Sequence, residues 1–105
     1  MDKDQIKEAI SNDRIVLFMK GDRLFPQCGF SSRVVRILEE HGVDYKEYDV
    51  MSDAELRENI KEYSDWPTIP QLYVDGEFIG GSDIVYDMHR EGELTEVLEV
   101  APESQ

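Results

Sequence analysis

Hydrophobic residues recur along the first twenty positions in two different patterns. Ile6 and Ile10 lie four residues apart among polar residues, which predicts a short amphipathic helix over residues 2–12. Residues 15–19 form an unbroken apolar run that is short for a helix and contains β-branched side chains. We therefore expect a strand there that is buried on both faces.

Helical spacing returns after a loop that contains Pro26. The pattern predicts a helix from about residue 29 to residue 41, and Gly42 stands where a C-terminal cap is expected. Residues 44–50 form a weaker strand candidate. The helix would bury four apolar residues: Phe30, Val34, Ile37 and Leu38.

A third helix is indicated by Ser52 and Glu55, because S-x-x-E is the spacing of a capping box. Leu56 and Ile60 would form its buried face. The sequence Trp-Pro-Thr-Ile-Pro at residues 66–70 then interrupts the helical pattern.

The strongest turn signal is Asp75-Gly76, which lies between residues 71–74 and 77–79. Asp-Gly readily adopts the positive φ angles of a two-residue hairpin turn, so we expect two antiparallel strands. Ser82 is expected to cap a further helix, which Gly92 interrupts. The apolar positions of this last region are Ile84, Val85, Met88, Leu94, Val97 and Leu98.

The predicted order of elements is α-β-α-β-α-β-β-α. A βαβ unit requires a parallel strand pair with a right-handed crossover, and the hairpin adds an antiparallel pair. We therefore predict an α/β fold with a four-stranded mixed sheet flanked by helices. The 105 residues suffice for a single domain over residues 1–105, with a core at about 6–98 and a short polar C-terminal tail.

The chain is strongly acidic, with 24 acidic residues, 11 basic ones and a formal net charge of −13. Such a charge repels nucleic acids and anionic membranes, so neither is expected as a partner. The acids are scattered, which fits a well-solvated surface or adaptation to a high-salt cytoplasm, and we favour the latter. A single cysteine and no signal-peptide pattern indicate a reducing, cytoplasmic location.

Cys28 is the candidate for reactive chemistry. It directly precedes a predicted helix, where unpaired backbone N–H groups and the helix dipole favour a thiolate. A free cysteine can also be an inert core residue. This one stands in a polar loop between Gln27 and Gly29, so we favour the reactive interpretation. Ser31 occupies the fourth position of the C-x-x-C pattern, which leaves no second thiol in the motif.

The sequence Cys-Gly-Phe-Ser at residues 28–31 resembles the signature of the monothiol glutaredoxins. The resemblance runs from about residue 6 to residue 98, through Met-Lys-Gly at 19–21, Trp-Pro-Thr-Ile-Pro-Gln at 66–71 and Gly-Gly-Ser-Asp at 80–83. It implies a thioredoxin-like fold and the use of glutathione, with Cys28 as the catalytic residue. Many relatives carry a second cysteine where this chain has Ser82, so a disulfide between the two sites is excluded here.

The resemblance also implies how the middle of glutathione is bound. Pro70 is expected to follow a cis peptide bond, which would turn the backbone of Ile69 outward to pair with the extended peptide. Thr68 belongs to the same binding segment.

The two ends of glutathione are implied to meet charged groups. Lys20 and Arg57 would hold the glycine carboxylate. Ser82 and Asp83 would lie at the γ-glutamyl end, where the helix N-terminus binds the carboxylate and Asp83 binds the ammonium. Simpler roles compete with these assignments. Lys20 can be a solvated strand end, Arg57 can pair with Asp53 one helical turn away, and Ser82 can serve only as a helix cap.

Two functions are compatible with a lone thiol. A [2Fe–2S] cluster usually takes four thiolates, and two protomers with two glutathione molecules supply four, with Cys28 as the metal ligand. The resemblance accordingly implies a homodimer bridged by the cluster, iron–sulfur cluster assembly and transfer, and partners such as a BolA-like protein and iron–sulfur acceptor proteins. The alternative is a weak glutathione-dependent thiol–disulfide oxidoreductase that acts on mixed disulfides.

The two histidines are expected to have structural roles. His41 would interact with the last carbonyl groups of its helix, and His89 would lie on the surface of a later helix. Neither has metal-ligand spacing to the other or to Cys28, so no mononuclear zinc site is expected.

Overall fold

The computed structural model of this chain describes residues 1–99, and the end of the predicted polar tail lies outside the described residues. The order of elements agrees with the predicted one, and the last helical region forms two helices. The elements are α1 (Lys3–Asn12), β1 (Ile15–Met19), α2 (Gly29–His41), β2 (Lys46–Asp49), α3 (Ala54–Ser64), β3 (Gln71–Val74), β4 (Glu77–Gly80), α4 (Ser82–Arg90) and α5 (Glu93–Glu99).

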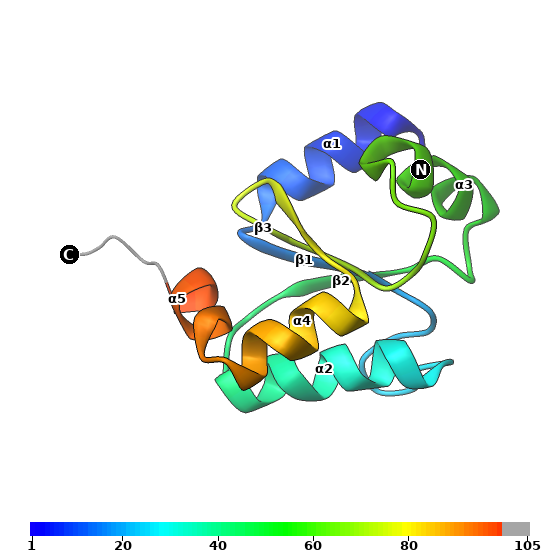
Figure 1. The fold of residues 1–105 in the computed structure, drawn as a ribbon. Helices are drawn as coiled ribbons and strands as arrows, with labels where there is room; N and C mark the ends of the chain where they lie inside the picture. The colour runs from blue at the N-terminus through cyan, green and yellow to red at the C-terminus, as the bar shows by residue number, and fades with distance from the viewer. Residues whose placement is uncertain (100–105) are drawn as a thin grey trace.

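The four strands form one mixed sheet, as predicted, and their order in the sheet is β2-β1-β3-β4. β1 pairs with β2 in parallel and with β3 antiparallel, so that Leu17 lies beside Glu47 on one side and Leu72 on the other. α1 and α3 cover one face of the sheet, and α2 and α4 cover the other (Figure 1). The arrangement is that of a thioredoxin-like fold.

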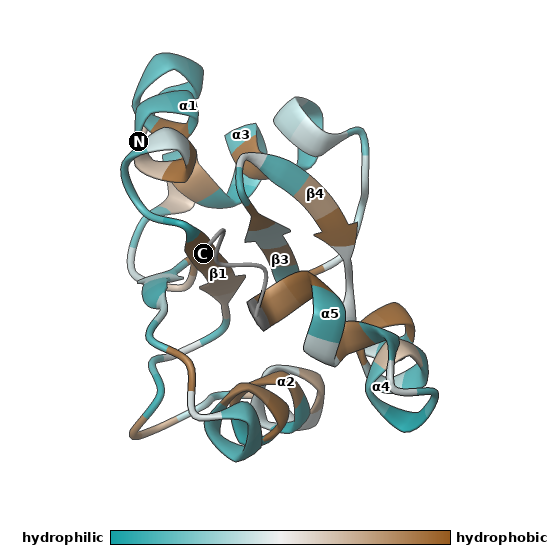
Figure 2. Cartoon of the chain, turned by 90° about the vertical axis from the view of Figure 1, so that its left-hand side faces the viewer, coloured by the Kyte–Doolittle hydropathy of each residue, from teal (hydrophilic) through white to brown (hydrophobic). Residues whose placement is uncertain are grey.

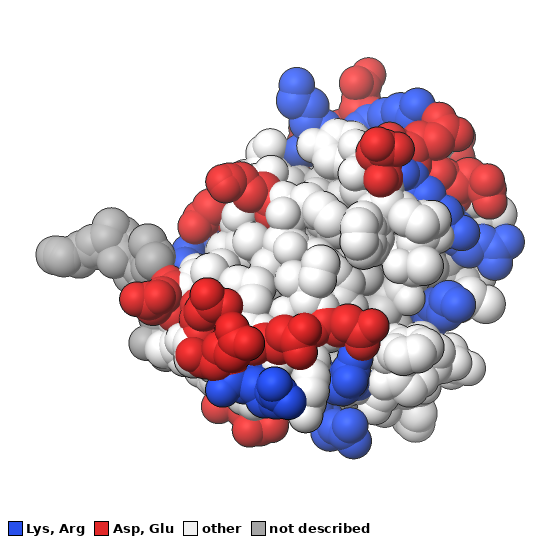
Figure 3. All heavy atoms as spheres, viewed as in Figure 1, with Lys and Arg blue, Asp and Glu red and all other residues white. Residues whose placement is uncertain are grey.

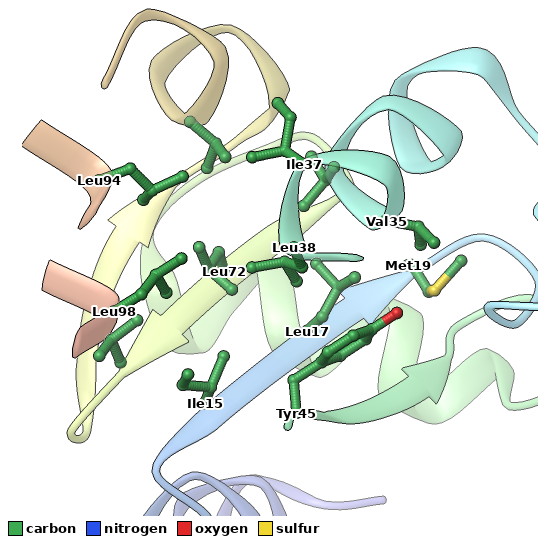
Figure 4. Packing of buried hydrophobic residues seen from close by; sticks show 13 residues of the cluster. Ile15, Leu17, Met19, Val35, Ile37, Leu38, Tyr45, Leu72, Leu94 and Leu98 are labelled. Atoms are coloured by element: carbon green, nitrogen blue, oxygen red, sulfur yellow. The ribbon is translucent and has the colours of Figure 1, made fainter. Parts of the chain in front are cut away.

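The core consists of two apolar clusters, one on each face of the sheet. β1 serves both, because Leu17 packs toward α2 whereas Phe18 packs toward α1 and α3. All five residues of β1 are buried, which confirms the strand predicted from the continuous apolar run. Figure 2 shows β1 among the most hydrophobic segments, and Figure 4 shows Ile37 and Leu38 of α2 above Leu17 and Leu72.

Two turns follow the sequence prediction closely. Asp75 and Gly76 have φ angles of 53° and 83°, which are the positive values of a type I′ hairpin turn. Gly42 ends α2 in the left-handed conformation with a φ of 66°.

Both predicted helix caps near the later helices are wrong by one residue. Asp53, not Ser52, caps α3, since its carboxylate accepts from the backbone N–H of Leu56 at 3.0 Å. The Ser52 hydroxyl instead donates to the carbonyl oxygen of Asp49. Gly81 caps α4, and Ser82 is the first residue of that helix.

The histidines are not isolated from each other. His41 Nε2 and His89 Nδ1 lie 3.1 Å apart, so one ring donates to the other. The contact joins the last turns of α2 and α4, which pack side by side. His89 remains partly exposed, as expected for a surface position, and its contact with His41 is an addition that the sequence did not indicate.

Phe30 and Ile84 fit the helical spacing of buried residues, yet their exposed fractions are 61% and 40%. They begin α2 and α4 at the same end of the molecule, where the candidate site lies. Within residues 1–99, none of the helices has the length and apolar character needed to span a membrane.

Candidate functional site

Cys28 occupies the N-cap position of α2. Its Sγ accepts a hydrogen bond from the backbone N–H of Ser31 at 3.3 Å and lies 3.4 Å from the Ser31 hydroxyl oxygen. That oxygen also accepts from the backbone N–H of Lys20 at 3.0 Å. A serine hydroxyl has two acceptor lone pairs and one proton, so it can accept from Lys20 and donate to an ionised sulfur at the same time.

The surroundings favour the thiolate form of Cys28. Burial raises the pKa of the thiol, but hydrogen bonds from the Ser31 hydroxyl and from backbone N–H groups at the helix start act the other way, as does the charge of Lys20. The net result is a Cys28 pKa below the ordinary value. The direction expected from the sequence is confirmed.

A cavity of about 600 Å³ opens beside the first turn of α2. Ligand pockets commonly measure about 300–1,000 Å³, so a tripeptide is a suitable occupant by size. Cys28 itself does not line this cavity, but Phe30 and Lys20 do. The backbone N–H of Phe30 and the charge of Lys20 both act on the Cys28 thiol. The lining includes every residue that the resemblance assigned to glutathione: Lys20, Arg57, Thr68, Ile69, Pro70, Ser82 and Asp83.

One wall of the cavity is the segment that leads into β3. The peptide bond between Ile69 and Pro70 is cis, as the resemblance implied. Pairing of β3 with β1 begins at Gln71, so the backbone of Ile69 precedes the strand ladder. The Gln71 side chain is fully buried and donates to the carbonyl oxygens of Trp66 and Thr68, which fixes the course of this wall.

Another part of the lining is the N-terminus of α4, where Gly81 lies close to Pro70. Its cap, Gly81, provides no side-chain hydrogen bond, so the first N–H groups of the helix have no partner from the cap. Ser82 Oγ accepts from Arg33 Nε at 2.9 Å, and Asp83 accepts from Arg33 Nη2 at 2.6 Å. The sequence analysis did not identify Arg33, because nothing in the local pattern of α2 indicates a contact fifty residues away.

Three cations line the cavity: Lys20, Arg57 and Lys61. Figure 3 shows basic groups on the right-hand side of the molecule and a row of acidic groups over α4 toward α5. The competing ion pair of Arg57 with Asp53 is not seen in the described residues, where the Asp53 carboxylate instead accepts from the Met1 amino group at 2.7 Å. Trp66, Met51 and Glu58 also belong to the lining, although the sequence analysis gave them no role in the site.

Within the described residues, no three His, Cys, Asp or Glu side chains converge as metal ligands. Cys28 is the only cysteine of the chain and thus supplies one thiolate. A bound cluster would therefore need ligands from outside the protomer.

The family model described as glutaredoxin matches residues 15–79. A Synechocystis protein named as an uncharacterized monothiol glutaredoxin, ycf64-like, is 54% identical over 99 residues, which cover 94% of this chain and 92% of that protein. The mitochondrial monothiol glutaredoxin-5 of Saccharomyces cerevisiae is also 54% identical over 99 residues, with coverage of 91% and 66%.

The fold is shared with a solved structure of similar length. A monomeric truncated mutant of Trypanosoma brucei 1-C-Grx1 superposes with a TM-score of 0.85 at 41% identity, covering 93% of this chain and 89% of that one. This likeness supports the thioredoxin-like assignment independently of the motifs.

The expected cytoplasmic location is wrong by these comparisons. Relatives from Saccharomyces cerevisiae, Schizosaccharomyces pombe and Danio rerio are named as mitochondrial proteins, and one from Oryza sativa as chloroplastic. A reducing environment, which the single cysteine indicated, does not distinguish the cytoplasm from these organelles.

Proposed function

The chain belongs to the monothiol glutaredoxins, and from this premise we propose that it binds glutathione beside Cys28 and carries a [2Fe–2S] cluster between two copies of itself. The observation that carries the proposal is the combination of one thiol per chain with an adjoining cavity of tripeptide size. The cluster is the cargo, and its assembly and transfer to acceptor proteins is the function.

The cavity offers suitable groups along the whole length of glutathione. Lys20 and Arg57 would bind the glycine carboxylate through charge-assisted hydrogen bonds. The backbone of Ile69 would pair with the cysteinyl part, as in strand addition. The γ-glutamyl end would lie at the uncapped start of α4, beside Ser82 and Asp83.

The number of ligands determines the assembly. One Cys28 thiolate and one glutathione thiol from each protomer give the four thiolates that the cluster needs. The complex is therefore a homodimer that forms only with cluster and glutathione present. A BolA-like protein that supplies ligands of its own would replace one copy, and iron–sulfur acceptor proteins would receive the cargo.

The test is anaerobic reconstitution with iron, sulfide and glutathione, followed by absorption spectroscopy and size-exclusion chromatography. We expect a brown dimer from the wild type, and a colourless monomer when glutathione is omitted or Cys28→Ser is used. Ser32→Ala, in the first turn of the same helix, is the matched control. A cluster on Cys28→Ser would contradict the proposed ligand set.

A second function is favoured by the lowered pKa of Cys28. Its thiolate would attack the glutathione sulfur of a mixed disulfide, so that a Cys28–glutathione bond forms and the substrate leaves as a thiolate that takes up a proton. A second glutathione thiolate then attacks this bond, releases oxidised glutathione and regenerates Cys28. Reduction of a mixed disulfide by a colourless, cluster-free sample would support this function over the first.

A further inference from the structure

A cation that the family motifs do not include lies beside Ser82 and Asp83, two residues that line the cavity. Arg33 reaches from α2 to α4, where it donates to both Ser82 and Asp83. Its guanidinium carbon also lies 4.7 Å from the ring centroid of Tyr86. Because three groups of α4 hold this side chain, the guanidinium has a defined position beside the cavity.

Arg33 weakens the attraction of this site for the ammonium of a γ-glutamyl group and strengthens its attraction for the carboxylate. The Asp83 carboxylate, which would otherwise attract the ammonium, already pairs with Arg33 at 2.6 Å. The Ser82 oxygen accepts from Arg33, so its own proton is available to donate to a carboxylate. The positive charge of Arg33 adds to the helix N-terminus on the anion-binding side.

Resting on the proposed function, we propose that Arg33 determines which charge of glutathione this chain recognises at its γ-glutamyl end: the α-carboxylate rather than the α-ammonium. Arg33 is a positioning and specificity-determining residue, not a catalytic one. The chain should accordingly tolerate glutathione analogues that lack the amino group.

The test compares two unreactive ligands, S-methylglutathione and the same compound with hydrogen in place of the glutamyl amino group. Trp66 is the only tryptophan and lines the cavity, so its fluorescence can follow both titrations. The measured quantity is the ratio of the two dissociation constants. A general structural loss would weaken both ligands together and leave this ratio unchanged.

For the wild type we expect a ratio near one. Arg33→Gln releases Asp83 to bind the ammonium, and the ratio should rise about two- to fivefold, the range typical of one exposed ion pair. Arg36→Gln is the matched control, because it removes the same charge from an exposed position one turn along α2 and should leave the ratio near one. Adding Asp83→Asn to Arg33→Gln should return the ratio toward one.

Two results would overturn the inference. One is a ratio well above one in the wild type, and the other is a ratio that Arg33→Gln does not raise. Failure of the proposed function has a different signature, since neither ligand would then bind the wild type at all. That outcome would remove both proposals together.

Discussion

Ser31→Ala tests how the fold activates Cys28. The Ser31 hydroxyl lies 3.4 Å from Sγ and is a hydrogen-bond donor available to the thiolate, besides the backbone N–H groups that remain in the variant. A hydrogen bond to a charged group contributes about 1.5–3 kcal/mol, and this long contact to sulfur belongs at the lower end. We therefore expect the Cys28 pKa to rise by about one unit, equivalent to roughly 1.4 kcal/mol.

The same substitution should also destabilise the fold. Ser31 is fully buried, and its oxygen accepts from the backbone N–H of Lys20. A buried donor left without an acceptor costs about 1–3 kcal/mol, which urea unfolding would measure. The rate of Cys28 alkylation as a function of pH gives the pKa. Ser32→Ala is the control, because the hydrogen bond seen for Ser32 in the described residues runs from its backbone N–H to Cys28 O, which the substitution keeps. An unchanged or lower pKa in Ser31→Ala would refute the assigned role.

Three further outcomes are expected. The free energy of unfolding of the wild type, relative to that of Cys28→Ser, should increase as pH rises from the lowered Cys28 pKa toward the ~8.5 of a free thiol, because the folded state then binds fewer protons than the unfolded state. Urea titrations across this pH range measure the difference, and a difference that falls with pH would contradict the lowered pKa. Melting temperature should rise in potassium chloride from low to molar concentration, since screening relieves repulsion among the surplus acids, and a flat curve would contradict the high-salt interpretation. His89→Ala should lower the free energy of unfolding by about 1 kcal/mol, because it removes the contact with His41. His41→Ala already lacks this contact, so adding His89→Ala to it should cause no further loss.

The backbone elements were predictable because their causes are local. The unbroken apolar run of β1 and the Asp75-Gly76 turn each carry a signal within a few residues. The predictions of the helix caps failed where either of two neighbouring residues could have served as the cap. Ser52 and Asp53 are both good N-caps, and only the path of the loop decides that Asp53 faces the N–H of Leu56.

The candidate site was predictable only as far as the motifs extend. All seven residues assigned to glutathione by resemblance line one cavity, although they come from segments far apart in the sequence. The sequence analysis missed Arg33 because its partners belong to another helix, and helical spacing alone does not identify a partner outside the helix itself. Phe30 and Ile84 were misassigned for the same reason, since a hydrophobic face beside a cavity has the same periodicity as one in the core.

Whether so acidic a chain attracts a small anion depends on how far its surplus acids lie from the cavity. Three of its eleven basic residues line the cavity, where only two acids, Glu58 and Asp83, accompany them. The molecule measures 38 × 28 × 24 Å, whereas the Debye length at physiological ionic strength is about 8 Å, so most of the surplus acids are screened from a small ligand in the cavity. We therefore expect the net charge to repel extended polyanions, which would contact much of the surface. If the proposals above hold, the charges that line the cavity, with Arg33 beside it, would determine which small anion is accepted.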